Sequence, residues 1–302
     1  MKRLFALMII LIMVLSSCTI TETTSKDNND PSSSNESKIT TDQSTTEDLP
    51  EISFTESVVV DNEQCTIKIT KFEEDIIWGT TLKVFLENKS ADKKYMFAAD
   101  ALYVNGLEIE PFFATEVESG KKSNESLILT LSEEEEKELG TITEIVVKFR
   151  VYDSDDIMSD NVAEATAKIY PYGEDKAQKY TREDKSTDTV LVNNDSVKII
   201  VMGYTEDEIW GYSANLYIEN KTDKELMISA DDVSVNGYMI DPFFATTVGS
   251  EKCRFADISW FTDAFEENEI EKVTDIEFNL RVYDSDNWEA KDVYNEKVIL
   301  KP

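Results

Sequence analysis

Residues 65–69, Cys-Thr-Ile-Lys-Ile, alternate apolar and polar side chains, and this alternation decides the fold class. Successive side chains of a β-strand point to opposite faces, so Cys65, Ile67 and Ile69 share one face. Two further stretches have the same period, with apolar members Leu82, Val84 and Leu86, and then Val147, Phe149 and Val151. Strands with one apolar and one polar face are typical of antiparallel sheets that are covered on one side. The sequence therefore predicts an all-β fold.

The chain carries two copies of one domain. The matching segments are Val58–Asn88 with Val190–Asn220, Val104-Asn105-Gly106 with Val235-Asn236-Gly237, and Arg150–Asp155 with Arg281–Asp286. A repeat of this length gives each copy enough residues for a core of its own. We therefore predict a first domain at residues 51–172, a polar linker at 173–188 and a second domain at 189–302, and we call these domains the first and second copies.

Turn and helix signals complete the predicted architecture. Asn105-Gly106 and Asn236-Gly237 lie between apolar runs, where a type I′ hairpin turn needs two residues that accept positive φ. In the first copy Ser132 is placed to cap a short helix, with Glu135 three residues later and Gly140 at its end. Asp263 and Glu266 take the same places in the second copy. With roughly seven or eight strands per copy, the pattern predicts two antiparallel, immunoglobulin-like β-sandwiches, each with one short helix.

The order of these features resembles a known group of proteins. An Asn-Gly turn, Phe-Phe-Ala-Thr, a short capped helix and a strand ending in Val-Tyr-Asp-Ser-Asp resemble the extracellular immunoglobulin-like domains of Gram-positive surface lipoproteins. The resemblance spans residues 55–302 and implies a fold and a location. It implies no chemistry.

The N-terminus predicts export and a lipid anchor. Lys2 and Arg3 precede an apolar run from Leu4 to Leu15 that is too short to span a bilayer. Leu15-Ser16-Ser17-Cys18 resembles the lipobox of bacterial lipoproteins, which implies cleavage after residue 17 and lipid attachment at Cys18. Residues 18–50 are rich in Ser, Thr and Asp, so we expect a disordered tether. The predicted location is the extracellular face of the bacterial cell membrane, in the cell-wall zone.

Composition argues against an enzyme. The chain has no histidine, which excludes Ser-His-Asp triads, Cys-His pairs and His-ligated metals. Glycine-rich phosphate loops are absent from the sequence, and Cys65 and Cys253 do not occupy equivalent positions in the two copies. We expect no cofactor and two free thiols. A cell-wall enzyme of the carboxylate type is the remaining catalytic alternative.

Charge limits the partners. The formal net charge is −32, so nucleic acid is repelled and basic partners or divalent cations are favoured. The Tyr-Asp-Ser-Asp segments supply the four carboxylates that form the strongest candidate for calcium: Asp153, Asp155, Asp284 and Asp286. A turn in which Asp and Ser bond to their own backbone explains the same residues. Both interpretations stay open.

Aromatic side chains are the other candidates for binding. They occur in equivalent positions of the two copies: Trp78 and Trp210, Phe112 and Phe243, and Phe113 and Phe244. Adjacent phenylalanines in an extended segment point to opposite faces, so one of each pair is core and the other is available for sugars or for a protein. We predict a non-catalytic binding or spacing module for an unidentified protein or glycan partner, with a calcium-dependent module as the alternative.

Overall fold

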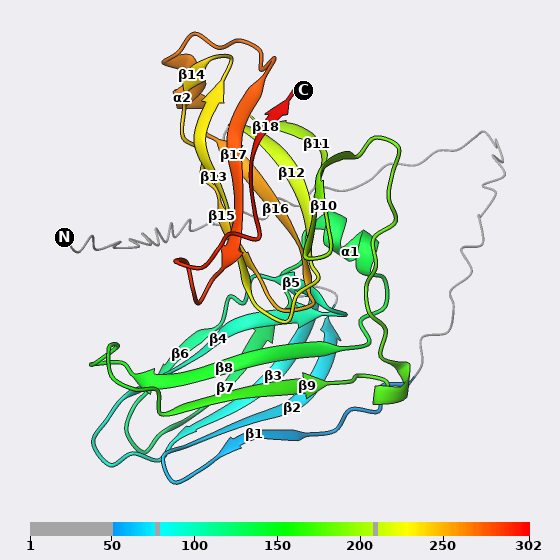
Figure 1. Ribbon diagram of the computed structural model, residues 1–302. Coiled ribbons are helices and arrows are strands. Elements are labelled where there is room, and N and C mark those ends of the chain that lie inside the picture. The colour runs from blue at the N-terminus through cyan, green and yellow to red at the C-terminus, as the bar shows by residue number, and fades with distance from the viewer. Residues whose placement is uncertain (1–50, 76–78, 208–210) are drawn as a thin grey trace, which may run out of the picture. The chain divides into compact units, whose positions relative to one another are not determined.

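Each copy of the domain is a β-sandwich built from two sheets. The computed structural model describes residues 51–75, 79–207 and 211–302. The predicted signal peptide, Cys18, the tether, Trp78 and Trp210 lie outside these residues. The prediction of an all-β sandwich-like fold is confirmed (Figure 1).

The first copy contains nine strands and one α-helix within the described residues. They are β1 (Ser57–Asp61), β2 (Cys65–Asp75), β3 (Gly79–Asn88), β4 (Tyr95–Val104), β5 (Leu107–Ile109), β6 (Ala114–Val117), β7 (Lys122–Ile128), α1 (Glu133–Leu139), β8 (Ile145–Asp153) and β9 (Ala163–Ile169). A short 3-10 helix, η1 (Glu174–Lys176), follows in the linker.

The second copy repeats this order over its own described residues. Its elements are β10 (Thr189–Asn193), β11 (Val197–Asp207), β12 (Gly211–Asn220), β13 (Leu226–Val235), β14 (Tyr238–Met239), β15 (Ala245–Val248), β16 (Cys253–Trp260), α2 (Thr262–Glu266), β17 (Ile276–Asp284) and β18 (Tyr294–Leu300). The short strands β5 and β14, of three and two residues, raise the count above the predicted seven or eight, because a segment so short shows no alternation.

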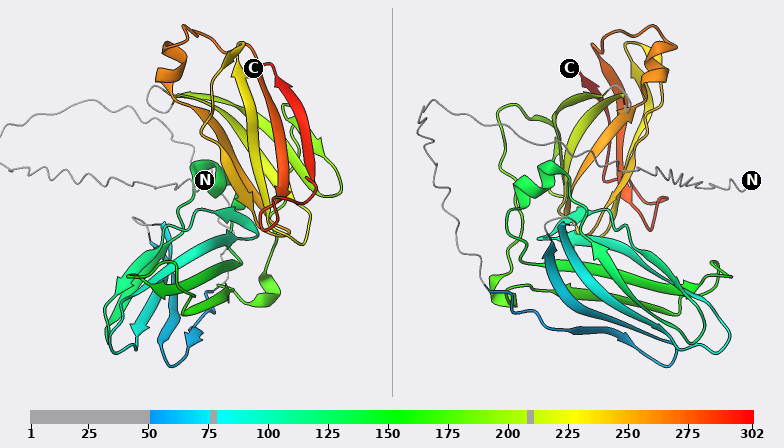
Figure 2. Two further views of the ribbon diagram at one scale, coloured as in Figure 1. Left: turned by 60° about the vertical axis from the view of Figure 1, so that its left-hand side comes forward. Right: turned by 180° about the vertical axis from the view of Figure 1, so that it is seen from behind.

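The strand order is the same in both copies. In the first, β1-β2-β3-β7 form one sheet, and β5-β4-β8-β9 form the other, with β6 also paired to β4. In the second, the corresponding orders are β10-β11-β12-β16 and β14-β13-β17-β18, with β15 paired to β13. Figure 2 shows the sheets of each copy from two further sides.

The predicted inward faces form the core. Cys65, Ile67 and Ile69 are fully buried, as are their counterparts Val197 and Ile199. One cluster of buried side chains fills each sandwich, and the cluster of the first copy also includes three residues of the second copy, namely Ile200, Tyr217 and Cys253. Residues 49–302 group as one compact unit. The boundaries of two separate domains stay a prediction.

The hairpin prediction is confirmed, and the helix prediction is confirmed in one copy. Asn105 and Gly106 have φ values of 50° and 85°, and the Asn-Gly turn of the second copy matches them. Ser132 forms the predicted capping box with Glu135. The prediction that Asp263 caps the second helix is wrong, because α2 begins at Thr262 and the cap position is occupied by Phe261, two residues before Asp263. Asp263 lies in the first turn instead, where the helix dipole stabilises a carboxylate.

A buried asparagine closes one end of each sandwich. The Asn88 side chain is fully buried, and its Nδ2 donates to the carbonyl oxygens of Lys93 and Val117, each at 2.8 Å. Its Oδ1 accepts from the Ser90 N–H at 2.9 Å. Asn220 makes the same set of bonds in the second copy, to Lys224, Val248 and Thr222. One side chain thus fixes the loop after β3 or β12 to the end of β6 or β15.

A second asparagine fixes the opposite end. Oδ1 of Asn105 accepts from the backbone N–H groups of Thr143 at 2.9 Å and Glu144 at 3.0 Å, and its Nδ2 donates to the Thr141 carbonyl at 2.8 Å. Asn236 bonds in the same way to Thr274, Asp275 and Lys272. The Asn-Gly hairpin is therefore held against the segment that enters β8 or β17.

One parallel pairing joins the two copies, which corrects the prediction of purely antiparallel sheets. β5 pairs with β16 through Leu107 opposite Cys253 and Glu108 opposite Arg254, so a mixed sheet of nine strands runs through both copies. The Glu108 side chain is buried there and accepts from the Gly249 N–H at 2.8 Å and from Arg254 Nη1 at 3.2 Å. We call this contact the junction.

The junction depends on two residues, Gly249 and Glu108, that are not repeated at the equivalent positions of the other copy. A Cβ at Gly249 would lie 2.5 Å from the Tyr103 hydroxyl, so glycine allows the close approach. The first copy has Glu118 at that position, and the second copy has Met239 in place of Glu108. The two copies have therefore diverged where they meet.

Replacing Asn88 with Ala is expected to lower the free energy of unfolding by about 1–3 kcal/mol, because one buried and one partly buried carbonyl lose their donor. Asn124→Ala is the matched control, since Asn124 is exposed on β7. Urea unfolding of both variants measures the difference. Equal midpoints for the two variants would contradict the role given to Asn88.

Candidate functional site

The paired phenylalanines divide between core and solvent as predicted. Phe112 is 74% exposed and Phe243 is 79% exposed. Phe113 is buried against Phe149, with ring centroids 6.1 Å apart and an edge-on geometry, and Phe244 packs against the core of the second copy. Each copy therefore presents one phenyl ring to solvent at the same place in the fold.

In the second copy the exposed ring borders a groove. The cavity has a volume of about 730 Å³ and is lined by Thr205, Glu206, Asp207, Gly211, Ser213, Phe243, Asp257, Ser259 and Phe261. We call it the aromatic groove. Its size lies within the range of pockets that hold small ligands or side chains of a partner.

The register of three strands builds the floor of the aromatic groove. Thr205, Ser213 and Ser259 are directly opposite one another on β11, β12 and β16. Their neighbours along the strands, such as Ala214 and Ile258, point inward and are fully buried, so the floor is the outward face of the sheet.

Hydrogen bonds fix the floor and one of its walls. The Ser213 and Ser259 hydroxyl oxygens are 2.8 Å apart. The Phe243 N–H donates to the Ser259 carbonyl at 2.7 Å, which holds the Phe243 segment beside β16. Phe261 follows Ser259 by two positions and is 55% exposed, so the groove has a phenyl ring from each of two segments.

The aromatic groove is acidic. The exposed Asp257 accepts from Asn215 Nδ2 at 2.8 Å, and Glu206 and Asp207 also line the cavity. None of the described residues that line it is Lys or Arg. An amide donor leaves the charge of the Asp257 carboxylate uncompensated, so the groove has a negative potential.

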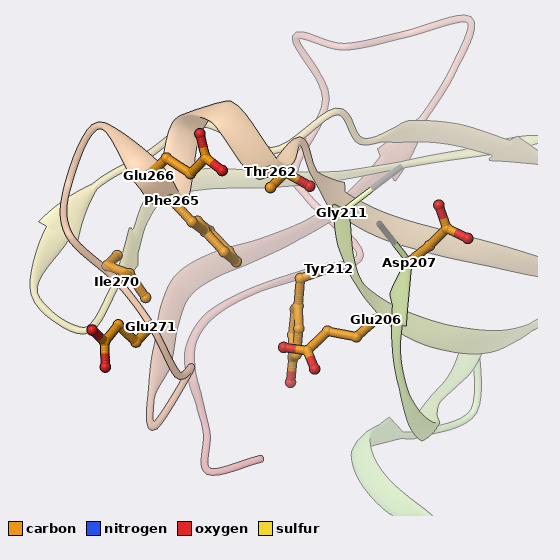
Figure 3. A pocket seen from close by; sticks show the side chains of 9 residues that line it. All are labelled: Glu206, Asp207, Gly211, Tyr212, Thr262, Phe265, Glu266, Ile270 and Glu271. Atoms are coloured by element: carbon orange, nitrogen blue, oxygen red, sulfur yellow. The ribbon is translucent and has the colours of Figure 1, made fainter. Parts of the chain in front are cut away.

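A second hollow lies on the other side of the β11–β12 end, beside α2. It has a volume of about 430 Å³, and Figure 3 shows the Phe265 ring entering it from α2 and the Tyr212 ring from β12. Both rings are more than nine-tenths buried, and burial raises the pKa of Tyr212. A hollow of about 460 Å³ occupies the same place in the first copy. These hollows offer little accessible aromatic surface, which makes the aromatic groove the better candidate.

The Tyr-Asp-Ser-Asp loops form turns held by lysines. Asp153 Oδ2 lies 2.8 Å from Lys93 Nζ, and its Oδ1 accepts from the Asp155 N–H at 3.1 Å. Asp284 makes the same contacts in the second copy, with Lys224 at 2.5 Å and with the Asp286 N–H at 3.1 Å. The bond to lysine lowers the pKa of both carboxyls.

Calcium would have to displace these lysines. Within residues 51–75, 79–207 and 211–302, no group of three or more acidic or cysteine side chains is arranged to hold a metal ion. The backbone bonds predicted for Asp153 and Asp284 are confirmed, whereas the Ser285 hydroxyl donates to Glu225 instead of to its own backbone. The calcium hypothesis gains no support from the loops.

The two described cysteines are buried free thiols. Burial raises the pKa of Cys253 to about 11, so this thiol stays protonated at neutral pH. Cys253 lies in the junction, opposite Leu107. Neither thiol lines the aromatic groove.

Most residues of the aromatic groove do not stand out in the sequence. The sequence predicts a binding role for Phe243, but not for Asp257, Ser259 and Phe261. A usable signal was present in the repeat, since the first copy has Ser126, Ile128 and Thr130 at these positions. Polar and aromatic side chains that appear in one copy alone indicate a function of that copy.

Comparison with known proteins assigns the chain to no family. No protein-family model matches the chain, and a search of curated proteins finds no relative. In the described part of the chain, no helix has both the length and the apolar character needed to cross a membrane.

Proposed function

We propose that this protein is a lipid-anchored bacterial surface protein whose second copy is a non-catalytic binding module. The observation that carries the proposal is the aromatic groove, in which Phe243 and Phe261 expose 79% and 55% of their surfaces. Exposed phenyl rings that line one groove with a polar floor are unfavourable in water and are typical of interaction sites.

The position of the buried carboxyl supports binding over catalysis. A carboxylate-type hydrolase needs one acid whose pKa is raised and which faces the substrate. Burial raises the pKa of Glu108, but this carboxyl lies in the junction, bonded to Arg254 and to the Gly249 N–H. It is not among the residues that line the aromatic groove.

The junction supports a spacing role for the first copy. β5 and β16 share backbone hydrogen bonds across it, and a buried ion pair accompanies them. Fixing the second copy in this way limits the conformational entropy lost when its groove binds a partner. The proposed partner is a protein or glycan outside the cell, and a net charge of −32 disfavours nucleic acid.

The proposed location depends on Cys18. Replacing Cys18 with Ala should release the protein into the medium, because the lipid chains that hold it at the membrane cannot be attached. Immunoblotting of membrane and medium fractions measures the distribution, and Cys65→Ala is the control with a cysteine changed elsewhere. Retention of the Cys18 variant in the membrane fraction would contradict the anchor.

The proposed binding role depends on the two exposed rings. The mature chain carrying Cys18→Ala is immobilised and tested against hexa-arginine, a Gly-Ser hexapeptide, cellohexaose and polyglutamate. We expect at least one probe to bind, with an affinity lowered about tenfold or more by Phe243→Ser with Phe261→Ser. Phe112→Ser, which removes the equivalent ring of the first copy, should leave that affinity unchanged. Binding of none of the probes, or equal effects of the two sets of substitutions, would contradict the proposal.

A further inference from the structure

The two copies differ in charge at the floor of the aromatic groove. In the first copy Lys71 and Lys83 approach Glu73, with nitrogen–oxygen distances of 2.5 and 3.4 Å, so the positive charges exceed the negative one. The corresponding residues of the second copy are Gly203, Asn215 and Thr205. Both lysines are therefore absent from the floor of the aromatic groove.

The second copy also gains a carboxylate. Lys83 Nζ donates to the Ser126 hydroxyl at 2.9 Å in the first copy. The equivalent contact in the second copy runs from Asn215 Nδ2 to Asp257 Oδ1 at 2.8 Å. The cross-strand contact is thus kept, while a cation and a hydroxyl are exchanged for an amide and an anion.

The second copy also gains an aromatic ring in the same groove, four positions after that carboxylate. Phe112 is kept as Phe243, and Thr130 is replaced by Phe261. A cation within about 6 Å of a phenyl centroid is attracted by the ring. The chain already uses such contacts, since Lys122 Nζ lies 5.9 Å from the Phe85 centroid.

We propose that the aromatic groove binds the cationic side chains of a basic peptide. Asp257 receives the ammonium or guanidinium group, and the Phe243 and Phe261 rings contact its charged end and its aliphatic stem. This inference rests on the proposed binding function and adds the chemical class of the ligand. Charge complementarity selects a basic peptide over a neutral glycan, because the differences between the copies remove cations and add an anion at the same place.

The net charge of −32 requires a control, because any basic peptide is attracted to such a chain. Asp195 provides it. This carboxylate is exposed in the turn between β10 and β11 of the same copy, and it does not line the aromatic groove. Asp195→Asn and Asp257→Asn remove the same charge from the same copy, so they differ only in position.

The test is a titration of the mature chain carrying Cys18→Ala with fluorescein-labelled hexa-arginine, followed by fluorescence anisotropy. We expect Asp257→Asn and Phe261→Thr each to weaken binding by about threefold to tenfold, and Asp195→Asn to weaken it by less than about twofold. Thr is chosen for Phe261 because it is the residue that the first copy carries. Thermal unfolding of each variant shows whether the fold is retained.

Three results would overturn the inference. Equal losses for Asp257→Asn and Asp195→Asn would show attraction to the whole acidic surface. Binding of cellohexaose instead of hexa-arginine, lost in Phe243→Ser with Phe261→Ser, would assign the groove to glycans and leave the binding function standing. Binding that is insensitive to every substitution in the groove would contradict both the proposed ligand class and the proposed binding site.

Discussion

Each sandwich depends on one buried asparagine, Asn88 in the first copy and Asn220 in the second. Loops that cross the open end of a sandwich bring backbone carbonyls out of water, and a buried carbonyl without a donor is costly. Asn220 supplies donors to the carbonyls of Lys224 and Val248. Val248 ends β15, shortly before β16 begins, and β16 carries Asp257 and Ser259. Asn220 thus fixes the end of the sandwich from which β16 runs to the aromatic groove.

The two copies differ in their charges and in their contacts. The first copy uses its short strand β5 and the buried Glu108 to hold the second, and it neutralises its outward face with Lys71 and Lys83. In the described residues, β14, the equivalent strand of the second copy, pairs only with β13. The outward face of the second copy is acidic and aromatic. The contact at Gly249 depends on a residue without a side chain, and the equivalent position of the first copy holds Glu118.

Much of the fold follows from local patterns in the sequence. Alternation of apolar residues locates the long strands, and the Asn-Gly pairs, which accept positive φ, locate the hairpins. Adjacent phenylalanines divide between core and solvent. The junction escapes such patterns, because Leu107-Glu108-Ile109 is short and a buried glutamate has the same sequence appearance as an exposed one. Asp257 and Phe261 escape them as well, since the groove forms only when the register of β11, β12 and β16 brings distant residues together. The helix boundary at Thr262 differs from the prediction by two residues, because the cap position is occupied by Phe261, which makes no side-chain cap.

We propose that one groove of the second copy recognises a partner. The most direct measurement is the change in backbone amide NMR shifts of the mature chain carrying Cys18→Ala when hexa-arginine is added. We predict that the largest shifts belong to Ser213, Asp257, Ser259 and Phe261. Shifts spread evenly over the acidic surface, or centred on Asp153 and Asp284, would contradict it.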